Sequence, residues 1–226
     1  MSTSSFGNPL VEQRDLLSGK AAVALDSKVI TVTGEDRLKW LHALLSQNIV
    51  NLEPGQSCEA LLLNPQGHIE ASIHIVDDGT TATLIVDENS ADLVLNHLIK
   101  MKLRTKVDIE LHEELQVFGS FGNAIEGAQV VWHDPWPGVY PGGHRYATST
   151  GEPWNYFESV IALSGLAEAG TVALEALRVA AHRPSMSEVD EKTLPHELDW
   201  MATGVHLSKG CYRGQESVAK VHNLGH

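Results

Sequence analysis

The spacing of hydrophobic residues along the first half of the chain predicts short strands interrupted by helices. Apolar residues at every second position, the period of a strand with one buried face, are clearest at Ile69, Ala71, Ile73 and Ile75. Comparable apolar runs predict further strands over residues 21–25, 28–33, 58–63, 80–86, 107–111 and 115–118. Between residues 35 and 46, leucines recur at helical spacing and predict a helix.

Two more helices and a less regular region complete the predicted order. Ser90 can cap a helix over residues 90–99, and Pro184 ends a helix over residues 171–182. Asp26 and Ser27 are predicted to form a tight turn between the first two strands. Residues 119–155 are rich in Gly, Pro and Trp, with short strands predicted at 129–132 and 145–148. This order is typical of an α+β fold with a largely antiparallel sheet.

Composition and charge narrow the class of protein. The 226 residues carry 16 Lys and Arg against 29 Asp and Glu, a formal net charge of −13. Such acidity argues against direct binding to nucleic acid or to an anionic membrane. The polar first ten residues and the absence of a long apolar run predict a cytoplasmic protein. With two cysteines, the chain alone is not expected to hold an iron–sulfur cluster, and no histidine set has metal-site spacing.

The segment around Cys211 carries the strongest chemical signal. Lys209 and Arg213 each stand two residues from this cysteine, and nearby cations favour a thiolate over a thiol. Residues 214–221 are predicted to form a short helix, whose N-terminal dipole would favour the same form. Gly210 and Gly214 are residues suited to a sharp turn or a close backbone approach. On chemistry alone, a buried structural cysteine in a tight turn explains the pattern equally well.

The motif K-G-C-Y-R-G-Q-E, at residues 209–216, is similar to the K-G-C-Y-x-G-Q-E signature of the YgfZ family. Members of that family are folate-binding relatives of the glycine cleavage T-protein and assist iron–sulfur protein maturation. Residues 174–184, L-E-A-L-R-V-A-A-H-R-P, resemble a second family block, A-L-R-I-E-A-G-R-P. Weaker similarity at residues 34–50 and 61–75 extends the resemblance over nearly the whole chain.

The resemblance implies a T-protein-like fold of two interwoven α+β subdomains followed by a C-terminal β-barrel. We expect an exposed lead-in over residues 1–19 and a folate-binding domain over residues 20–226. Its subdomains are expected at about 20–118 and 119–226. Because the sequence ends just past the motif, the barrel is expected to be missing from this chain.

The resemblance also assigns roles to individual residues. Cys211 is expected to act as a reactive thiol, with Lys209 and Arg213 keeping it partly ionised. Tetrahydrofolate or a derivative is expected as the bound cofactor, and it need not be consumed. Its expected contacts are Arg178, Tyr212, Gln215 and Glu216. The implied partners are iron–sulfur client proteins or assembly factors, including those of tRNA-modifying enzymes.

Two other functions are compatible with the same resemblance. One is a folate-dependent aminomethyltransferase, but the T-protein family has two aspartates where this chain has Ala71 and Ser72. Glu70 is adjacent, yet neighbouring strand residues point to opposite faces, so it is a poor substitute. The other is a scaffold with neither thiol nor folate chemistry.

A basic segment stands apart from the motif. If residues 100–107 form a strand, the four cations share one face and could bind the glutamate tail of folate or RNA phosphate. A solvated strand face explains the same pattern. The four residues are Lys100, Lys102, Arg104 and Lys106.

Overall fold

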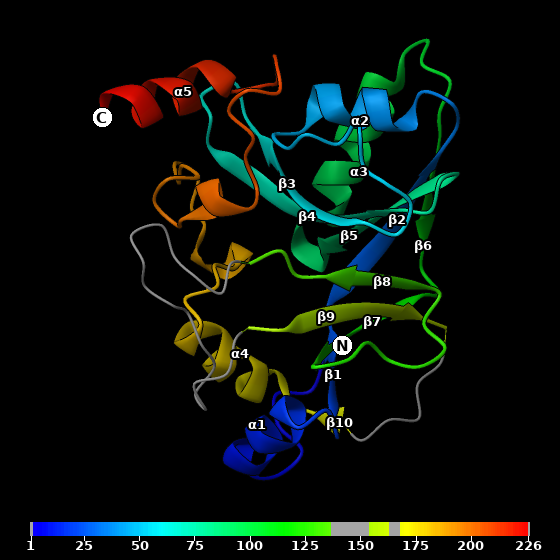
Figure 1. Ribbon diagram of the computed structural model, residues 1–226, viewed down its shortest axis with the longest axis vertical. Helices are drawn as coiled ribbons and strands as arrows, with labels where there is room; N and C mark the ends of the chain where they lie inside the picture. The colour runs from blue at the N-terminus through cyan, green and yellow to red at the C-terminus, as the bar shows by residue number, and fades with distance from the viewer. Residues whose placement is uncertain (1, 137–153, 163–167, 226) are drawn as a thin grey trace. The chain divides into compact units, whose positions relative to one another are not determined.

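The computed structural model describes residues 2–136, 154–162 and 168–225 and forms two compact units. The first unit comprises Met1–Lys28 and Glu113–Arg183, and the second comprises Val29–His112 and Pro184–His226. Each unit therefore takes two separate segments of the chain (Figure 1). The strand predicted at residues 145–148 lies outside the described residues.

The first unit is built on a five-stranded sheet in the order β10-β1-β7-β9-β8. Strands β1 and β10 pair in parallel, while β1–β7, β7–β9 and β8–β9 are antiparallel. The strands are β1 Ala22–Leu25, β7 Gln116–Phe121, β8 Val130–His133, β9 Tyr156–Ile161 and β10 Glu168–Ala169.

Helices α1 (Pro9–Leu17) and α4 (Thr171–Ala180) belong to the same unit. The expected exposed lead-in over residues 1–19 is instead partly helical: the Asn8 side chain caps α1, Pro9 opens it, and Leu16 is fully buried. Buried Glu12 accepts hydrogen bonds from three main-chain nitrogens, which hold its pKa below the usual value. The Gly170 nitrogen at 2.7 Å has the largest effect, and those of Phe6 and Gly7 add to it.

The second unit has a sheet in the order β3-β4-β5-β2-β6, with helices α2 and α3 packed against it (Figure 1). The β3–β4, β4–β5 and β2–β6 pairings are antiparallel. The strands are β2 Ser27–Thr33, β3 Ser57–Leu63, β4 Ile69–Asp77, β5 Thr81–Asp87 and β6 Asp108–His112. The helices are α2 Arg37–Leu44, α3 Glu88–Lys102 and α5 Gln215–Leu224.

Alternation along β3 divides the second unit into two cores. Cys58, Ala60 and Leu62 pack in one cluster with residues of α2 and α3. Leu61 and Leu63 belong to a second cluster that contains Trp200 and the motif residue Tyr212. The side-chain period of a strand thus places the Tyr212 ring in a different core cluster from the one that contains residues of α2 and α3.

Two local predictions are wrong. The basic segment is not a strand: Lys100 and Lys102 lie in the last turn of α3, and Arg104 and Lys106 follow in a turn. Cations there complement the helix dipole, so the pattern arises from a helix end. Asp26 and Ser27 do not form the predicted tight turn, because Ser27 already begins β2, and β1 and β2 belong to different sheets.

The predicted α+β class with mostly antiparallel pairing is confirmed. The three predicted helices appear as α2, α3 and α4. Strands β9 and β10 and helix α1 were not predicted, and α3 is capped by Asp87 instead of Ser90. In the described part of the chain, no helix is both long and apolar enough to cross a membrane.

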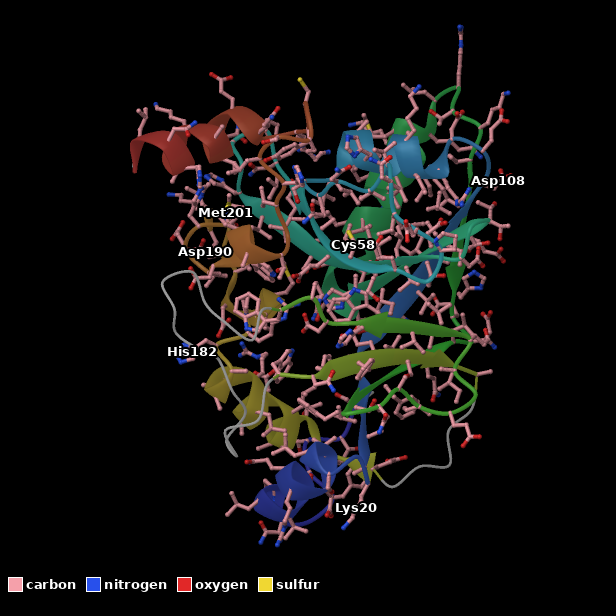
Figure 2. The ribbon with its side chains drawn as sticks, in the orientation of Figure 1. Lys20, Cys58, Asp108, His182, Asp190 and Met201 are labelled. Atoms are coloured by element: carbon pink, nitrogen blue, oxygen red, sulfur yellow. The ribbon has the colours of Figure 1, made fainter. Side chains whose placement is uncertain are left out.

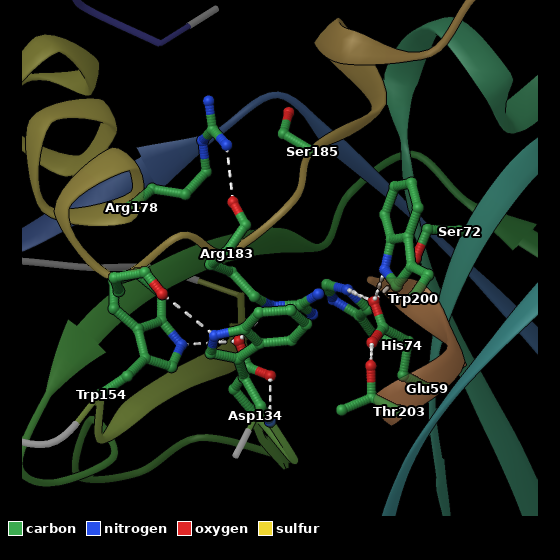
Figure 3. A network of polar contacts seen from close by, with 12 residues as sticks. Glu59, Ser72, His74, Asp134, Trp154, Arg178, Arg183, Ser185, Trp200 and Thr203 are labelled. Atoms are coloured by element: carbon green, nitrogen blue, oxygen red, sulfur yellow. Dashed lines mark hydrogen bonds and ion pairs between the residues drawn. The ribbon is translucent and has the colours of Figure 1, made fainter. Parts of the chain in front are cut away.

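A buried carboxylate fastens the returning segment to the second sheet. Glu59 of β3 accepts hydrogen bonds from Trp200 Nε1 at 2.9 Å and Thr203 Oγ1 at 2.5 Å. It also accepts one from Ser72 Oγ of the neighbouring strand at 3.0 Å, and its side chain is fully buried (Figure 3). These contacts attach the short helix η2 (Trp200–Ala202), which leads into the cysteine motif, to β3 and β4.

We expect Glu59→Leu to destabilise the protein by about 3 kcal/mol, because it leaves three buried donors without an acceptor. Glu59→Gln should cost about 1 kcal/mol, since the amide oxygen can serve Trp200 while the Thr203 hydroxyl can accept from the amide nitrogen. Urea unfolding would measure both. Glu110→Leu on the exposed side of β6 is the control, and an equal cost there would contradict the anchoring role.

Candidate functional site

The cysteine motif forms an exposed loop between η2 and α5. Within it, Cys211 is exposed, whereas the next residue, Tyr212, is buried against Trp200 and Val218. The tyrosine ring thus holds the loop in the core while the thiol faces solvent. The predicted helix after the motif is confirmed as α5.

Glycine at position 214 is required by a close approach of two backbones. Gly214 has φ +82°, and an added Cβ would lie 2.6 Å from the Asn64 carbonyl oxygen and 2.8 Å from the Gly67 Cα. Gly67, in the β3–β4 turn, has φ +87° and packs against the start of α5 in return. Gly210 has φ +103°, but its added Cβ would meet no described atom within 4 Å. The loop therefore needs Gly210 for its conformation and Gly214 for both conformation and space.

Lys209 attaches the loop to the end of α2. Its ammonium donates hydrogen bonds to the carbonyl oxygens of His42 and, at 2.6 Å, of Leu45. It also lies 5.0 Å from the centroid of the Tyr212 ring. Burial lowers the pKa of Lys209 to about 8, and the nearby Cys211 acts in the opposite direction. Lys209 and Cys211 are thus electrostatically coupled, although the main contacts of the ammonium are with carbonyls.

Arg213 is paired with a carboxylate on the sheet. Its Nη1 donates to Glu70 Oε2 at 3.1 Å, and both side chains are about one-third to one-quarter exposed. His97 of α3 experiences both charges. Its pKa is lowered chiefly by burial and next by Arg213, while Glu70 raises it. Part of the Arg213 charge is therefore compensated by Glu70.

The two cysteines have opposite environments. Cys58 lies within β3, where Figure 2 labels it, and its side chain is buried. Burial raises the pKa of its thiol to about 12. Cys211 is exposed in the motif loop, and neither residue is in a disulfide. Only the Cys211 thiol therefore meets the accessibility requirement for reaction at neutral pH.

The residues predicted to contact folate are placed differently. The Tyr212 hydroxyl is buried and has no hydrogen-bond partner among the described residues, and burial raises its pKa to about 12. Gln215 is partly buried and Glu216 exposed in the first turn of α5. The motif thus brings together Lys209, Cys211, Tyr212, Arg213, Gln215 and Glu216 in the second unit.

Arg178 belongs to the first unit, in the last turn of α4. Its guanidinium pairs with Glu175 at 2.9 Å and donates to the Arg183 carbonyl oxygen at 2.6 Å. Arg183 in turn pairs with buried Asp134 at 2.8 Å, as Figure 3 shows. These contacts attach the Arg178 guanidinium to the turn that follows α4.

Ala71 and Ser72, which the resemblance matches to the two transferase aspartates, have no carboxylate. Ala71 is fully buried in the core, and Ser72 donates its hydroxyl to Glu59. Glu70 is occupied by Arg213 from the motif. Within the described residues, no cluster of three or more His, Cys, Asp or Glu side chains could hold a metal ion.

His42 and Glu59 were not predicted as site residues. His42 contacts the Lys209 carbonyl oxygen, and Glu59 fixes the segment before the loop. Both partners are more than 140 residues away in sequence, so no local pattern could have indicated them. A buried Glu within an apolar strand is the one signal that could have drawn attention to position 59.

Comparison with known proteins gives relatives across most of the chain. No protein-family profile matches. An iron–sulfur cluster assembly factor IBA57 homolog, mitochondrial, of Mycosarcoma maydis is 27% identical over 216 residues, 87% of this chain and 52% of the relative. The tRNA-modifying protein YgfZ of Vibrio vulnificus is 23% identical over 212 residues, 87% of this chain and 64% of the relative. The chain thus spans about half to two-thirds of the length of these relatives.

A solved structure establishes the fold. The glycine cleavage system aminomethyltransferase T from Bartonella henselae superposes with a TM-score of 0.73 at 16% identity. The match covers 96% of this chain and 67% of that protein. The predicted T-protein-like fold is confirmed by this match. The predicted resemblance to the YgfZ family is confirmed separately, because the chain is similar to IBA57 and YgfZ proteins over 87% of its length.

Proposed function

We propose that this protein is a cytoplasmic, folate-binding accessory protein that supports the assembly or repair of iron–sulfur clusters in other proteins. Clients would include tRNA-modifying enzymes. The observation that carries this proposal is the exposed Cys211 on a loop fixed by buried neighbours, in a chain homologous to an assembly factor and to a tRNA-modifying protein. Cluster iron prefers thiolate ligands, and an exposed thiol can supply one to a partner's cluster.

The electrostatics of the loop support a thiol role. Lys209 is coupled to Cys211, and Arg213 adds a partly compensated charge on the other side. Thiolates are the form of cysteine that binds metals and reacts with electrophiles, and cations close to a thiol are typical of such sites. Because the chain contributes a single accessible thiol, any cluster it contacts would take its other ligands from a partner protein.

Tyr212 provides the structural test of whether the site suits tetrahydrofolate. A buried hydroxyl without a partner is unfavourable, and a polar atom of a bound ligand would satisfy it. Gln215 and Glu216, one turn later, would add amide and carboxylate groups of the kind that bind a pterin edge. Arg178 remains a proposed contact, but its bonds to Glu175 and Arg183 do not themselves support that role. When bound, tetrahydrofolate would supply a one-carbon or reducing group.

The alternative is a folate-dependent aminomethyltransferase, which the fold alone would allow. Ala71 and Ser72 argue against it, because neither can provide the carboxylate that assists transfer in the T-protein family. Glu70 cannot replace it while it is paired with Arg213. A scaffold without thiol or folate chemistry is the remaining alternative, and it predicts neither tetrahydrofolate binding nor a role for the Cys211 thiol.

We expect tetrahydrofolate to bind in a calorimetric titration and to give no ammonia release from an aminomethyl donor. Tyr212→Phe should weaken binding about tenfold, the factor of one good hydrogen bond. The same change should stabilise the free protein by about 1 kcal/mol, because it removes a buried unsatisfied hydroxyl. Absence of binding would exclude the folate role, whereas ammonia release at the rate of a T-protein would establish the transferase.

We expect iodoacetamide to label Cys211 at least about a hundredfold faster than Cys58 between pH 6 and 9, since only the thiolate reacts. Cys58 needs pH values near its pKa of about 12 to ionise, so its rate should stay low until the protein unfolds. Mass spectrometry of tryptic peptides would follow both sites.

The cellular role of the thiol requires a second measurement. Cys211→Ser should fold with a stability loss within about 2 kcal/mol, since the residue is exposed. In a strain that lacks its own YgfZ homologue, this variant should fail to restore the activity of iron–sulfur enzymes. Cys58→Ser, tested at matched protein levels, is the control. Full complementation by Cys211→Ser would show that the motif has a structural role only.

A further inference from the structure

The cysteine loop lies along the end of α2, and the contacts follow one another in order. Gln47 Nε2 donates to the Thr203 carbonyl oxygen at 2.6 Å, and Ser46 Oγ to that of Gly204 at 2.5 Å. The His206 nitrogen then donates to the Ser46 carbonyl oxygen at 3.0 Å. Leu207 and Ser208 are exposed, so the next attachment to α2 is at Lys209.

Lys209 and His42 of α2 hold each other through two separate contacts. The ammonium donates to the carbonyl oxygens of His42 and Leu45, which helix α2 leaves without partners at its end. In return, the imidazole Nε2 of His42 lies 3.1 Å from the main-chain oxygen of Lys209. The side chain of each residue therefore holds the backbone of the other.

The partners of the imidazole fix its protonation. Nδ1 of His42 lies 3.3 Å from the main-chain nitrogen of Ile49, which can only donate, so Nδ1 must accept. The Lys209 oxygen can only accept, so Nε2 must carry the proton. Both contacts are satisfied only by the neutral tautomer with hydrogen on Nε2.

We propose that His42 is a positioning residue for the cysteine loop: its neutral imidazole holds the Lys209 backbone and so keeps the lysine charge next to Cys211. This inference rests on the proposed role of the Cys211 thiol, but the attachment itself depends only on the geometry of the loop. Without the imidazole, the segment from Leu207 to Cys211 keeps only the flexible lysine side chain as its link to α2.

The surroundings of His42 agree with a neutral ring. The titratable groups that face it are Lys209 and His206. Burial lowers the pKa of His42 most, and the charge of Lys209 lowers it further. A histidine whose pKa is lowered in the folded protein stays neutral at pH 7 and also at pH values somewhat below its usual pKa. The Ile49 contact is therefore intact at pH 7 and is lost as pH falls through the lowered value, whereas Nε2 keeps its proton and its bond to the Lys209 oxygen.

Two substitutions separate positioning from a general structural role. Asparagine places an amide oxygen near the position of Nδ1 and keeps the Ile49 contact, but it is too short to reach Lys209. Glutamine can place its amide nitrogen near the position of Nε2 and donate to the Lys209 oxygen. His112→Gln is the matched control, because that histidine lies on β6 and bonds Thr31.

Hydrogen exchange of peptides covering residues 206–212 is the direct measurement, with alkylation of Cys211 as the chemical one. We expect His42→Asn to speed exchange of the loop about fivefold, the factor that one ordinary hydrogen bond carries. It should also slow alkylation of Cys211 at pH 7, because the Lys209 backbone loses its bond to the imidazole and the ammonium is held less firmly near Cys211. His42→Gln should restore both values to within about twofold of wild type.

The pH profile adds an independent check. After correction for intrinsic exchange, the wild-type Ile49 amide should lose protection as pH falls through the lowered pKa of His42, while the loop keeps its bond from Nε2. The proposal is overturned if His42→Asn leaves loop exchange and alkylation unchanged. It is also overturned if exchange rises equally in β3, which would indicate general destabilisation. Neither readout uses folate or a client protein, so failure of the proposed function would not affect the outcome.

Discussion

The arrangement of the candidate site depends on the buried carboxylate of Glu59. A charge fully removed from water is unfavourable unless donors surround it, and here Ser72, Trp200 and Thr203 supply them. Because two of these donors come from the far end of the chain, the carboxylate is satisfied only when that segment returns to the sheet. The cost of burying the charge thus makes the position of η2 specific.

Once η2 is fixed, the residues that follow have few alternatives. The chain runs from Thr203 along the end of α2, where carbonyl groups and polar side chains accept or donate main-chain hydrogen bonds. It then turns at Gly210, buries Tyr212 and passes Gly67 at backbone contact distance before α5 begins. Cys211 is exposed because its neighbour is buried, so the packing that stabilises the loop also presents the thiol.

The sequence predicts the parts of this structure that are set by local patterns. Alternation marks β4, leucine spacing marks α2, and the motif identifies Cys211 and the start of α5. The basic segment at residues 100–107 was wrongly predicted to be a strand, because alternating cations fit a strand as well as a helix end. Only tertiary contacts distinguish the two. Helix α1 was missed although Asn8 and Pro9 are ordinary start signals, since its polar sequence has little apolar periodicity.

The remaining features could not be predicted because they join distant parts of the chain. His42 meets Lys209 across 167 residues, and Glu70 meets Arg213 across 143. The second pairing joins strand β4 to the cysteine motif, because the Glu70 carboxylate accepts a hydrogen bond from Arg213. Strand β4 therefore helps to support the loop that carries the thiol.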